Sequence, residues 1–453
     1  MNERMSDEVG QEKQPTRSTE QPLRVVLTNI GTMADVHPLI ALALELTRRG
    51  HEPVLAVPEV FRERVRPLGI RFHAVRPDID PQNRELAARI YEPKQGTEYG
   101  LRRFLFPRLR ESYEDLLAAV NGPRRADLLV TGELNYAAPL VAEKTGIPWA
   151  SAVLAPISFF SVYDPPALPM YEWLSAVYGR VPGMGRGVNG LARAISRKWP
   201  EPILTLRREL GLAAGANPLF EGKHSPLLVL ALFHRLLGQR QRDWPAMTVQ
   251  TGFCFHDADS GMRALPEEME RFLEVGPAPV VFTLGSAAVM TAGSFFSVAA
   301  EACERMGRRA ILLVGPDERN RPQRALPESI CVAEYAPHSL LFPRAAAVVH
   351  QGGVGTVAQC LRAGVPMLIV PWSHDQPDNA SRMVRLGVAR SLKRSKLNAD
   401  RLAQGLTDLL EDSGYAAAAR SARQAMAGEC ADGCGAACDA MEKLVAARRI
   451  ATG

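Results

Sequence analysis

The chain has 453 residues, of which 46% are hydrophobic and 23% are charged. It is too long for one ordinary hydrophobic core and too apolar for a disordered protein, so we expect two domains. The net charge of +5 arises from 54 basic and 49 acidic residues that are mixed along the chain. Because no long block of like charge stands out, nucleic-acid binding is not indicated, and small molecules are the expected partners.

Targeting signals and disulfides are not indicated either. Residues 1–21 are polar and charged without an apolar core, which predicts a disordered leader and not a secretory signal. No apolar run approaches the length of a membrane span, so we expect no integral membrane association. The seven cysteines are an odd number scattered through a large chain, which argues against a disulfide framework and fits the reducing cytoplasm.

Three cysteines near the end of the chain, Cys430, Cys434 and Cys438, are spaced four apart. On a helix they share one face, and three thiols can ligate zinc. No His or fourth Cys lies nearby, and a small apolar helix face explains the spacing as well. We therefore expect no metal site.

In the first half, β-branched apolar runs alternate with helical patterns. The run Leu23–Ile30 is followed by a glycine-containing loop and by the helical pattern Pro38–Gly50. Further strand patterns follow at Pro53–Val57, at Asp127–Thr131 and from Trp149. Strands that alternate with helices predict a parallel sheet that is covered on both faces.

The middle of the chain, residues 156–199, mixes aromatics, prolines and glycines without sustained periodicity. Such a segment is typical of loops and short helices around a ligand pocket. Phe159, Phe160, Tyr171 and Trp173 are therefore candidates for an apolar acceptor-binding site. Packing of a loop onto the sheet explains the same aromatic residues equally well.

The alternation of strands and helices restarts after Pro245 and predicts a second parallel sheet. We place the junction near residues 235–258, between an N-terminal domain at 22–240 and a C-terminal domain at 258–432. The strands of the second half are expected at Pro279–Gly285, near Ile311, near Val332, up to His350 and up to Pro371.

The strongest chemical signal is the loop that follows the strand ending at His350. Three glycines, Gly352, Gly353 and Gly355, lead to Thr356 at the start of a helix. Glycines let the backbone approach a diphosphate closely, and a helix N-terminus offers unpaired N–H groups and the positive end of a dipole. His350 is able to donate a hydrogen bond to a phosphate oxygen without a permanent charge.

A second element follows the next strand, where Asp375 and Gln376 lie beyond Pro371. Open α/β sheets bind ligands at this end of their strands, and a carboxylate beside a carboxamide suits sugar hydroxyls. The two elements together resemble the donor signature of the UDP-glycosyltransferase superfamily, nucleotide-sugar glycosyltransferases of the GT-B fold. The similarity is greatest to bacterial antibiotic, macrolide and sterol glycosyltransferases, and it also covers Leu23–Pro38, Leu228–Phe253 and Phe282–Ser286.

This resemblance implies two facing Rossmann-like domains with an interdomain cleft, and a final helix in residues 433–453 that packs back on the N-terminal domain. It also implies roles for donor-binding residues. Ser286 matches a phosphate-loop position, although a simple helix N-cap explains it too. Tyr335 takes the place of the Trp that stacks on the nucleobase, or else packs on the surface. The donor-binding set is Ser286, Tyr335, His350, Gly352, Gly353, Gly355, Thr356, Gln359 (in place of a ribose-binding Glu), Asp375 and Gln376.

The resemblance assigns the general base to the loop Gly31–Pro38, where Asp35 occupies the family position. Glycosyl transfer requires a base because the acceptor proton leaves as its oxygen attacks. His37 is the rival, since its pKa suits a base near neutral pH. We favour Asp35, whose alternative role is to cap the following helix. The family's usual Gly before the base is Ala34 here, a departure that affects the loop's conformation.

The resemblance thus implies an inverting hexosyltransferase that needs no metal and no cofactor beyond its donor substrate, a UDP- or dTDP-sugar. The expected acceptor is a hydroxyl of a lipophilic small molecule, namely a natural product, a phenolic or a sterol-like compound. Two alternatives remain from the residues themselves. One is a catalytically silent protein that binds nucleotide sugars, and the other is a nucleotide-sugar epimerase of the same architecture.

Overall fold

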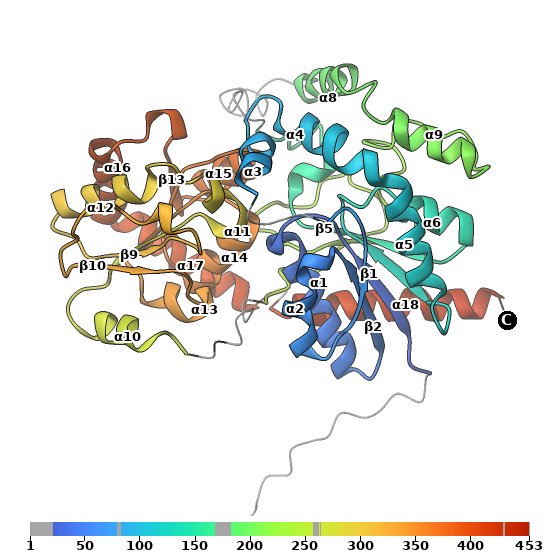
Figure 1. Ribbon diagram of the computed structural model, residues 1–453, viewed down its shortest axis with the longest axis horizontal. Helices are drawn as coiled ribbons and strands as arrows, with labels where there is room; N and C mark the ends of the chain where they lie inside the picture. Colours follow the sequence, from blue (N-terminus) through green and yellow to red (C-terminus); the bar gives the residue numbers. More distant parts are fainter. Residues whose placement is uncertain are drawn as a thin grey trace, which may run out of the picture.

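The computed structural model describes residues 21–78, 83–167, 183–256, 262, 264–428 and 431–452. The two halves of the chain form two lobes that lie side by side (Figure 1). Each lobe contains a parallel sheet with helices on both faces, as the alternation of patterns predicted. No helix in these ranges is long and apolar enough to cross a membrane.

The N-terminal lobe is built on a seven-stranded sheet in the order β3-β2-β1-β4-β5-β6-β7, in which all neighbours are parallel. The order of the strands reverses between β1 and β4. Ligands bind at such a switch point, beyond the carboxyl ends of the strands. The strands are β1 (Arg24–Thr28), β2 (Glu52–Val57), β3 (Arg71–Ala74), β4 (Leu128–Thr131), β5 (Trp149–Val153), β6 (Val229–Ala231) and β7 (Thr248–Gln250).

Successive residues of β1 enter different cores, as the two-residue period of a strand requires. Val25 and Leu27 pack with α1 and with the last helix of the chain, α18 (Gly433–Thr452). Val26 packs with α5 and α6 on the other face. The helices of this lobe are α1 (Met33–Arg48), α2 (Arg62–Val65), α3 (Arg84–Ile90), α4 (Gly96–Tyr99), α5 (Leu109–Asn121), α6 (Ala138–Thr145), α8 (Met184–Ile195) and α9 (Glu201–Glu209).

The C-terminal lobe repeats this plan with a six-stranded sheet in the order β10-β9-β8-β11-β12-β13, again parallel throughout. Its switch point lies between β8 and β11. The strands are β8 (Val280–Thr283), β9 (Ala310–Leu313), β10 (Ile330–Ala333), β11 (Ala347–His350), β12 (Met367–Ile369) and β13 (Ala389–Ser391).

Residues of β8 also alternate between two cores. Val281 packs with α14 and α17, whereas Val280 and Phe282 pack with α12 and α16. Both faces of this strand are therefore buried, which explains its continuous apolar sequence. The helices of this lobe are α10 (Glu267–Glu274), α11 (Gly285–Ala288), α12 (Phe295–Arg305), α13 (His338–Leu341), α14 (Val354–Ala363), α15 (Gln376–Arg385), α16 (Ala399–Glu411) and α17 (Ser413–Gly428).

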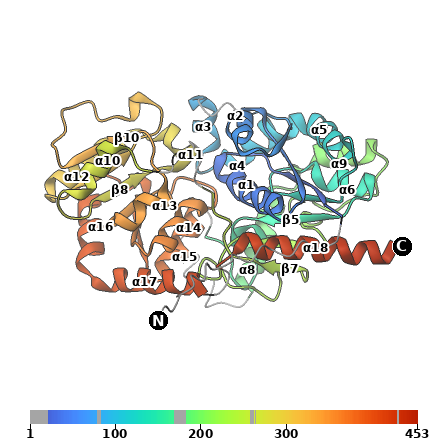
Figure 2. The ribbon, with the colours of Figure 1, turned by 90° about the horizontal axis from the view of Figure 1, so that it is seen from below.

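The last helix, α18, leaves the C-terminal lobe and lies along the N-terminal lobe (Figures 1 and 2). Cys438 and Met441 of this helix are fully buried in the same cluster as α1. Arg49, just after α1, bonds to Asp439 at 2.6 Å. The far end of the chain thus completes a core of the first lobe.

A segment of the N-terminal lobe lies between the two lobes, where α3 is seen in both views (Figures 1 and 2). We call residues 84–99, which include α3 and α4, the strap. Arg84 donates to the main-chain oxygen of Met290 at 2.8 Å and pairs with Asp317 at 3.1 Å. Tyr91 packs against the core of the C-terminal lobe. The strap therefore connects the N-terminal lobe to the C-terminal lobe.

A buried ion network forms a second connection between the lobes. Arg382 of α15 bonds to Asp378 at 2.7 Å and also pairs with Asp164 of the N-terminal lobe. The side chains of Arg382 and Asp378 are each 3% exposed. Asp378 also accepts the N–H of Ala167 at 2.9 Å. Because an unpaired buried charge costs several kcal/mol, the network depends on all of its members.

Candidate functional site

Polar side chains gather at the switch points of both sheets. In the N-terminal lobe, Asp35 follows β1 and Glu133 follows β4. In the C-terminal lobe, Ser286 follows β8 and His350 ends β11. The charge of Asp35 acts on Asp375 and contributes to raising the pKa of that carboxyl. The two strand-end sites therefore face each other between the lobes, where ligands of α/β sheets bind.

Asp35 caps the start of α1. Its Oδ2 accepts the N–H of Thr32 at 2.7 Å and the hydroxyl of Thr32 at 3.0 Å. A Cβ on Gly31 would come within 2.4 Å of the same oxygen, so this close approach requires a glycine. Burial raises the pKa of Asp35, while the hydrogen bonds from Thr32 act in the opposite direction. Within the described ranges, no hydrogen bond reaches the second oxygen, Oδ1.

His37, the rival base, lies two residues further along α1. Its ring lies edge-on to that of His256, with the centroids 5.8 Å apart. The proximity of His37 lowers the pKa of Asp35, so the two candidate bases are close together. The charge of Asp35 also acts on the carboxyl of Asp375 in the C-terminal lobe.

His350 is a buried and neutral histidine. Its Nδ1 accepts the N–H of Gly352 at 3.0 Å, so the ring proton lies on Nε2. The Nε2 atom is buried and has no hydrogen-bond partner in the described part of the chain. Burial lowers the pKa of His350 to about 3. Because an unsatisfied buried donor costs about 1–3 kcal/mol, this N–H group is suited to an acceptor that a ligand brings.

The glycines after His350 form an open helix start. Gly353 is the N-cap of α14, and no side chain caps this helix. The N–H groups of its first turn, including that of Thr356, have no partner within the helix. Gly352 has a φ of 91°, and a Cβ there would come within 2.9 Å of a side chain on β12, whereas Gly355 borders open space. Such a helix start attracts an anion.

Asp375 is linked to this loop through Asn379. The side-chain amide of Asn379 donates to Oδ2 of Asp375 at 2.7 Å and to the main-chain oxygen of Gly352 at 2.9 Å. Burial is the main cause that raises the pKa of Asp375 to about 7, and the charge of Asp35 adds to it. The preceding residue, His374, has a φ of 58°, a strained conformation of the kind that occurs at functional sites.

The side chain of Gln376 is engaged within the protein. Its Oε1 accepts the N–H groups of Trp372 and Ser373 at 2.8 and 3.2 Å, and the residue is 5% exposed. The backbone donors at this strand end need an acceptor because they are buried. Of the carboxamide expected to bind sugar hydroxyls, the carbonyl oxygen thus shapes the loop, and the NH₂ group is the part left for a ligand.

The remaining donor candidates lie on the same side of the C-terminal lobe. Ser286 is exposed on α11, and Tyr335 lies partly exposed in the turn after β10. Thr356 and Gln359 are one turn apart on α14, and each is 6% exposed. All four come from the carboxyl ends of strands or from the helix that follows.

The aromatic acceptor candidates contact other aromatic rings. Phe159 stacks on Trp244 with centroids 4.2 Å apart, and Phe160 lies 5.2 Å from Phe220. Phe159 also packs against a core cluster that contains residues of both lobes. These contacts are those of a loop packed on the sheet. Tyr171 and Trp173 lie outside the described residues.

The sequence patterns did not single out several polar residues at this site. Glu133 pairs with Lys223 at 3.1 Å and accepts the hydroxyl of Ser158, and its charge raises the pKa of Asp35. The position of Glu133 directly after a predicted strand was the available signal. For Tyr91 the sequence offered no such signal, because the strap has no periodic pattern and the partner of Tyr91, His374, lies far along the chain.

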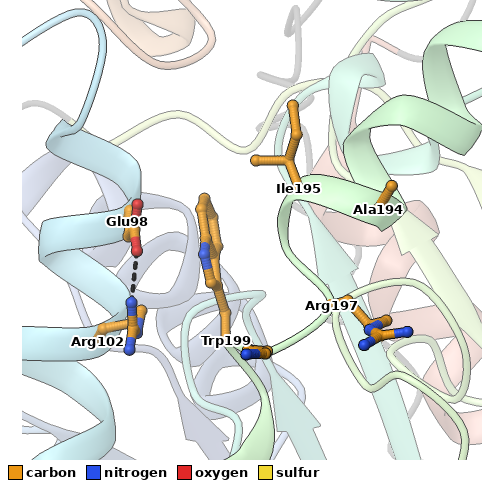
Figure 3. Close-up of a pocket in the computed structure, with 7 residues that line it drawn as sticks. Glu98, Arg102, Ala194, Ile195, Arg197 and Trp199 are labelled. Atoms are coloured by element: carbon orange, nitrogen blue, oxygen red, sulfur yellow. Dashed lines mark hydrogen bonds and ion pairs between the residues drawn. The ribbon is translucent and has the colours of Figure 1, made fainter.

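An open hollow of about 490 Å³ lies elsewhere on the N-terminal lobe (Figure 3). Glu98 and Arg102 line one side as an ion pair at 2.6 Å, and Ile195 and Trp199 line the other. None of the carboxylates or histidines at the switch points lines it. The hollow is therefore separate from the candidate site.

The cysteines near the end of the chain contribute to a core. Cys434 and Cys438 lie on α18, where they pack in one cluster with Cys254. Cys430 lies outside the described residues. Within the described ranges, no group of three or more His, Cys, Asp or Glu side chains is arranged to hold a metal ion.

Comparison with known proteins agrees with this geometry. Residues 25–163 match the glycosyltransferase family 28 N-terminal domain, and residues 307–434 match the C-terminal domain of erythromycin biosynthesis protein CIII-like proteins. The chain is 32% identical over 428 residues to O-mycaminosyltylonolide 6-deoxyallosyltransferase of Streptomyces fradiae, covering 90% of this chain and 94% of that protein.

More distant similarities point the same way. The vancomycin aglycone glucosyltransferase of Amycolatopsis orientalis is 29% identical, with 81% of this chain and 85% of that protein covered. The crystal structure of the glycosyltransferase VinC in complex with DTDP matches with a TM-score of 0.64 at 22% identity, covering 93% of this chain and 100% of that chain. The chain therefore belongs to the UDP-glycosyltransferase superfamily and is a glycosyltransferase of the GT-B fold.

Proposed function

We propose that the protein transfers a sugar from a dTDP- or UDP-sugar to a hydroxyl of a lipophilic natural product, with inversion at the anomeric carbon. The observation that carries this proposal is that Asp35 of one lobe lies near enough to Asp375 of the other lobe for its charge to raise the pKa of that carboxyl. A base beside a sugar-binding carboxylate is the arrangement that a single displacement requires.

In the proposed reaction, Asp35 takes the proton of the acceptor hydroxyl. The acceptor oxygen attacks the anomeric carbon, and the bond from that carbon to the diphosphate oxygen breaks with its electron pair on the diphosphate. Burial raises the pKa of Asp35, which makes its ionised form a stronger base. Oδ1 is the atom assigned to the proton, because Oδ2 already accepts two hydrogen bonds from Thr32.

The leaving diphosphate is assigned to the loop from His350 to Thr356. The unsatisfied Nε2–H of His350 and the uncapped start of α14 supply hydrogen-bond donors without a metal ion. Ser286 is assigned to the same phosphates and Asp375 to the donor sugar, with the NH₂ group of Gln376 beside it. Hydrogen-bond donors that are already in place need little reorganisation as charge develops on the leaving group.

Among nucleotide donors we favour dTDP-sugars. Some members of the family that the sequence resembles carry a Glu after the Gly-rich loop for the ribose hydroxyls. Gln359 lies in this neighbourhood here, and a deoxyribose has one hydroxyl fewer to bind. The structurally similar VinC was solved with DTDP, and the Streptomyces fradiae relative is a 6-deoxyallosyltransferase. Tyr335 is assigned to stacking on the nucleobase.

The acceptor is assigned to the N-terminal lobe around Asp35 and Glu133. The names of two relatives specify a tylonolide and the vancomycin aglycone as acceptors, which are large natural products. A natural-product hydroxyl is therefore the acceptor class that we propose.

The test is the release of nucleoside diphosphate from a panel of dTDP- and UDP-sugars, with macrolide, phenolic and sterol acceptors. Acceptor-dependent release supports the proposal and identifies the donor. Thermal protection by a donor, without release in the presence of any acceptor, indicates a silent binding protein instead. Equal release with and without acceptor indicates hydrolysis and contradicts transfer.

A further inference from the structure

The strap contacts the residue that precedes the sugar-binding carboxyl of Asp375. The ring of Tyr91 lies edge-on to that of His374, with centroids 5.2 Å apart and an interplanar angle of 75°. The hydroxyl of Thr97 lies 3.3 Å from Nδ1 of His374, and the same ring hydrogen-bonds to the main chain of Ile90. The strap thus holds His374 in its left-handed conformation and Asp375 beside it.

The C-terminal lobe fixes the position of Tyr91. Its ring packs against the core cluster that surrounds β8 and α12. Tyr91 is the C-cap of α3, and Arg84 at the start of this helix is held by the main-chain oxygen of Met290 and by Asp317. Tyr91 therefore lies in the N-terminal half of the sequence, but its side chain contacts the C-terminal lobe.

The hydroxyl of Tyr91 stays protonated near two carboxylates. Burial is the main cause that raises the pKa of Tyr91, and the charges of Asp35 and Asp375 add to it. A neutral phenol is a hydrogen-bond donor across the physiological pH range. Among the residues that the structure describes, none accepts a hydrogen bond from this hydroxyl.

We propose that Tyr91 is a specificity-determining residue of the donor site, whose hydroxyl donates a hydrogen bond to a hydroxyl oxygen of the donor sugar. This inference rests on the proposed function, because it requires a nucleotide sugar at Asp375. Ionised Asp35 and Asp375 only accept hydrogen bonds. Beside the NH₂ group of Gln376, the Tyr91 hydroxyl supplies a further hydrogen-bond donor for a sugar oxygen near the two carboxylates, and it adds no charge.

A consequence for substrate choice follows. A site that hydrogen-bonds a particular hydroxyl disfavours analogues that lack it, because the buried polar group is then left unpaired. Tyr91 therefore favours donors that keep an oxygen at the position it faces. Its effect falls on the sugar, since the nucleoside diphosphate is assigned to a different loop.

The experiment compares the parent with Tyr91→Phe, which keeps the ring on His374 and removes the hydroxyl. Tyr99→Phe is the matched control, because Tyr99 lies on the same strap with its ring under Arg89 at 5.6 Å. Calorimetry gives the dissociation constants of dTDP, dTDP-glucose, UDP and UDP-glucose for each protein. We expect Tyr91→Phe to bind the nucleotide sugar about 3- to 10-fold more weakly and the diphosphate as the parent does.

Each outcome distinguishes this inference from the proposed function. Parent-like binding of nucleotide sugar by Tyr91→Phe overturns the role of Tyr91 alone. An equal loss for the diphosphate and the nucleotide sugar also overturns it, because the effect is then on the arrangement of the lobes. If Tyr99→Phe weakens the binding of nucleotide sugar to the same extent as Tyr91→Phe, the role of Tyr91 is likewise overturned. A parent protein that binds none of the four ligands overturns the proposed function, and this inference with it.

Discussion

Replacing Asp35 by Asn removes the proposed proton acceptor and keeps the shape of the side chain. Loss of a positioned general base lowers a rate by about 10²- to 10⁴-fold, which corresponds to roughly 2.7–5.5 kcal/mol of activation free energy. The Asn carbonyl still accepts from the N–H and hydroxyl of Thr32, the contacts that cap α1. We therefore expect the free energy of unfolding to change by less than about 1 kcal/mol.

The sign of the small stability change follows from the pKa. Burial raises the pKa of Asp35 in the folded protein, so the stability that its protonated form contributes is lost as pH rises through the raised pKa. Asn carries no such charge, and the variant is expected to match or exceed the parent in stability at neutral pH. Urea unfolding at neutral pH measures this difference.

The assay is acceptor-dependent release of nucleoside diphosphate at saturating donor, for the parent, Asp35→Asn and His37→Gln. A rate for Asp35→Asn within about threefold of the parent refutes Asp35 as the base. The base is His37 if His37→Gln then shows the large loss. A loss accompanied by a large drop in stability also refutes the reasoning, since the cap and not the chemistry would then account for it.

Three further predictions concern the donor side and the ion network. His350→Ala is expected to lower kcat about 10²- to 10³-fold. His350→Gln keeps an N–H donor and is expected to retain more activity. Equal kcat values for the two variants in steady-state kinetics contradict the role of His350 as a hydrogen-bond donor. With its pKa raised from 3.8 to about 7, Asp375 contributes stability that is lost as pH rises between these values. The parent should therefore lose stability relative to Asp375→Asn between about pH 4 and about pH 7 in urea melts. A constant difference between the two proteins argues against a raised pKa. Arg382→Met leaves Asp378 buried without its partner and costs about 3–5 kcal/mol of unfolding free energy. The double variant with Asp378→Asn should recover part of this loss, and a single variant as stable as the parent in thermal melts excludes a buried ion pair.

The strand pattern of the fold is readable from the sequence because buried parallel strands are continuous apolar runs. The expected strand Leu23–Ile30 contains β1 at Arg24–Thr28, and the Gly-rich turn after His350 opens α14 as the pattern predicted. The start of α1 was harder to predict from the sequence. Its apolar pattern begins at Pro38, but the helix starts at Met33 because Thr32 and Asp35 cap it.

Short elements and long-range contacts leave no clear pattern in the sequence. The strand β7 spans three residues at Thr248–Gln250, inside the expected junction, and pairs with β6 of the N-terminal sheet. Such a short edge strand gives no period to detect. The inward turn of the Gln376 carbonyl and the contact of Tyr91 with His374 depend on three-dimensional packing, so local sequence carries no sign of them.

The return of α18 to the first lobe has a consequence for synthesis on the ribosome. The cluster around α1 includes Cys438 and Met441, which are translated after the whole second lobe. Until residues 433–452 emerge, the nascent first lobe presents an apolar face of α1 and β1 to solvent or to chaperones. Completion of the first lobe is therefore expected only after the second lobe has been made, although the strands of the first lobe are made first.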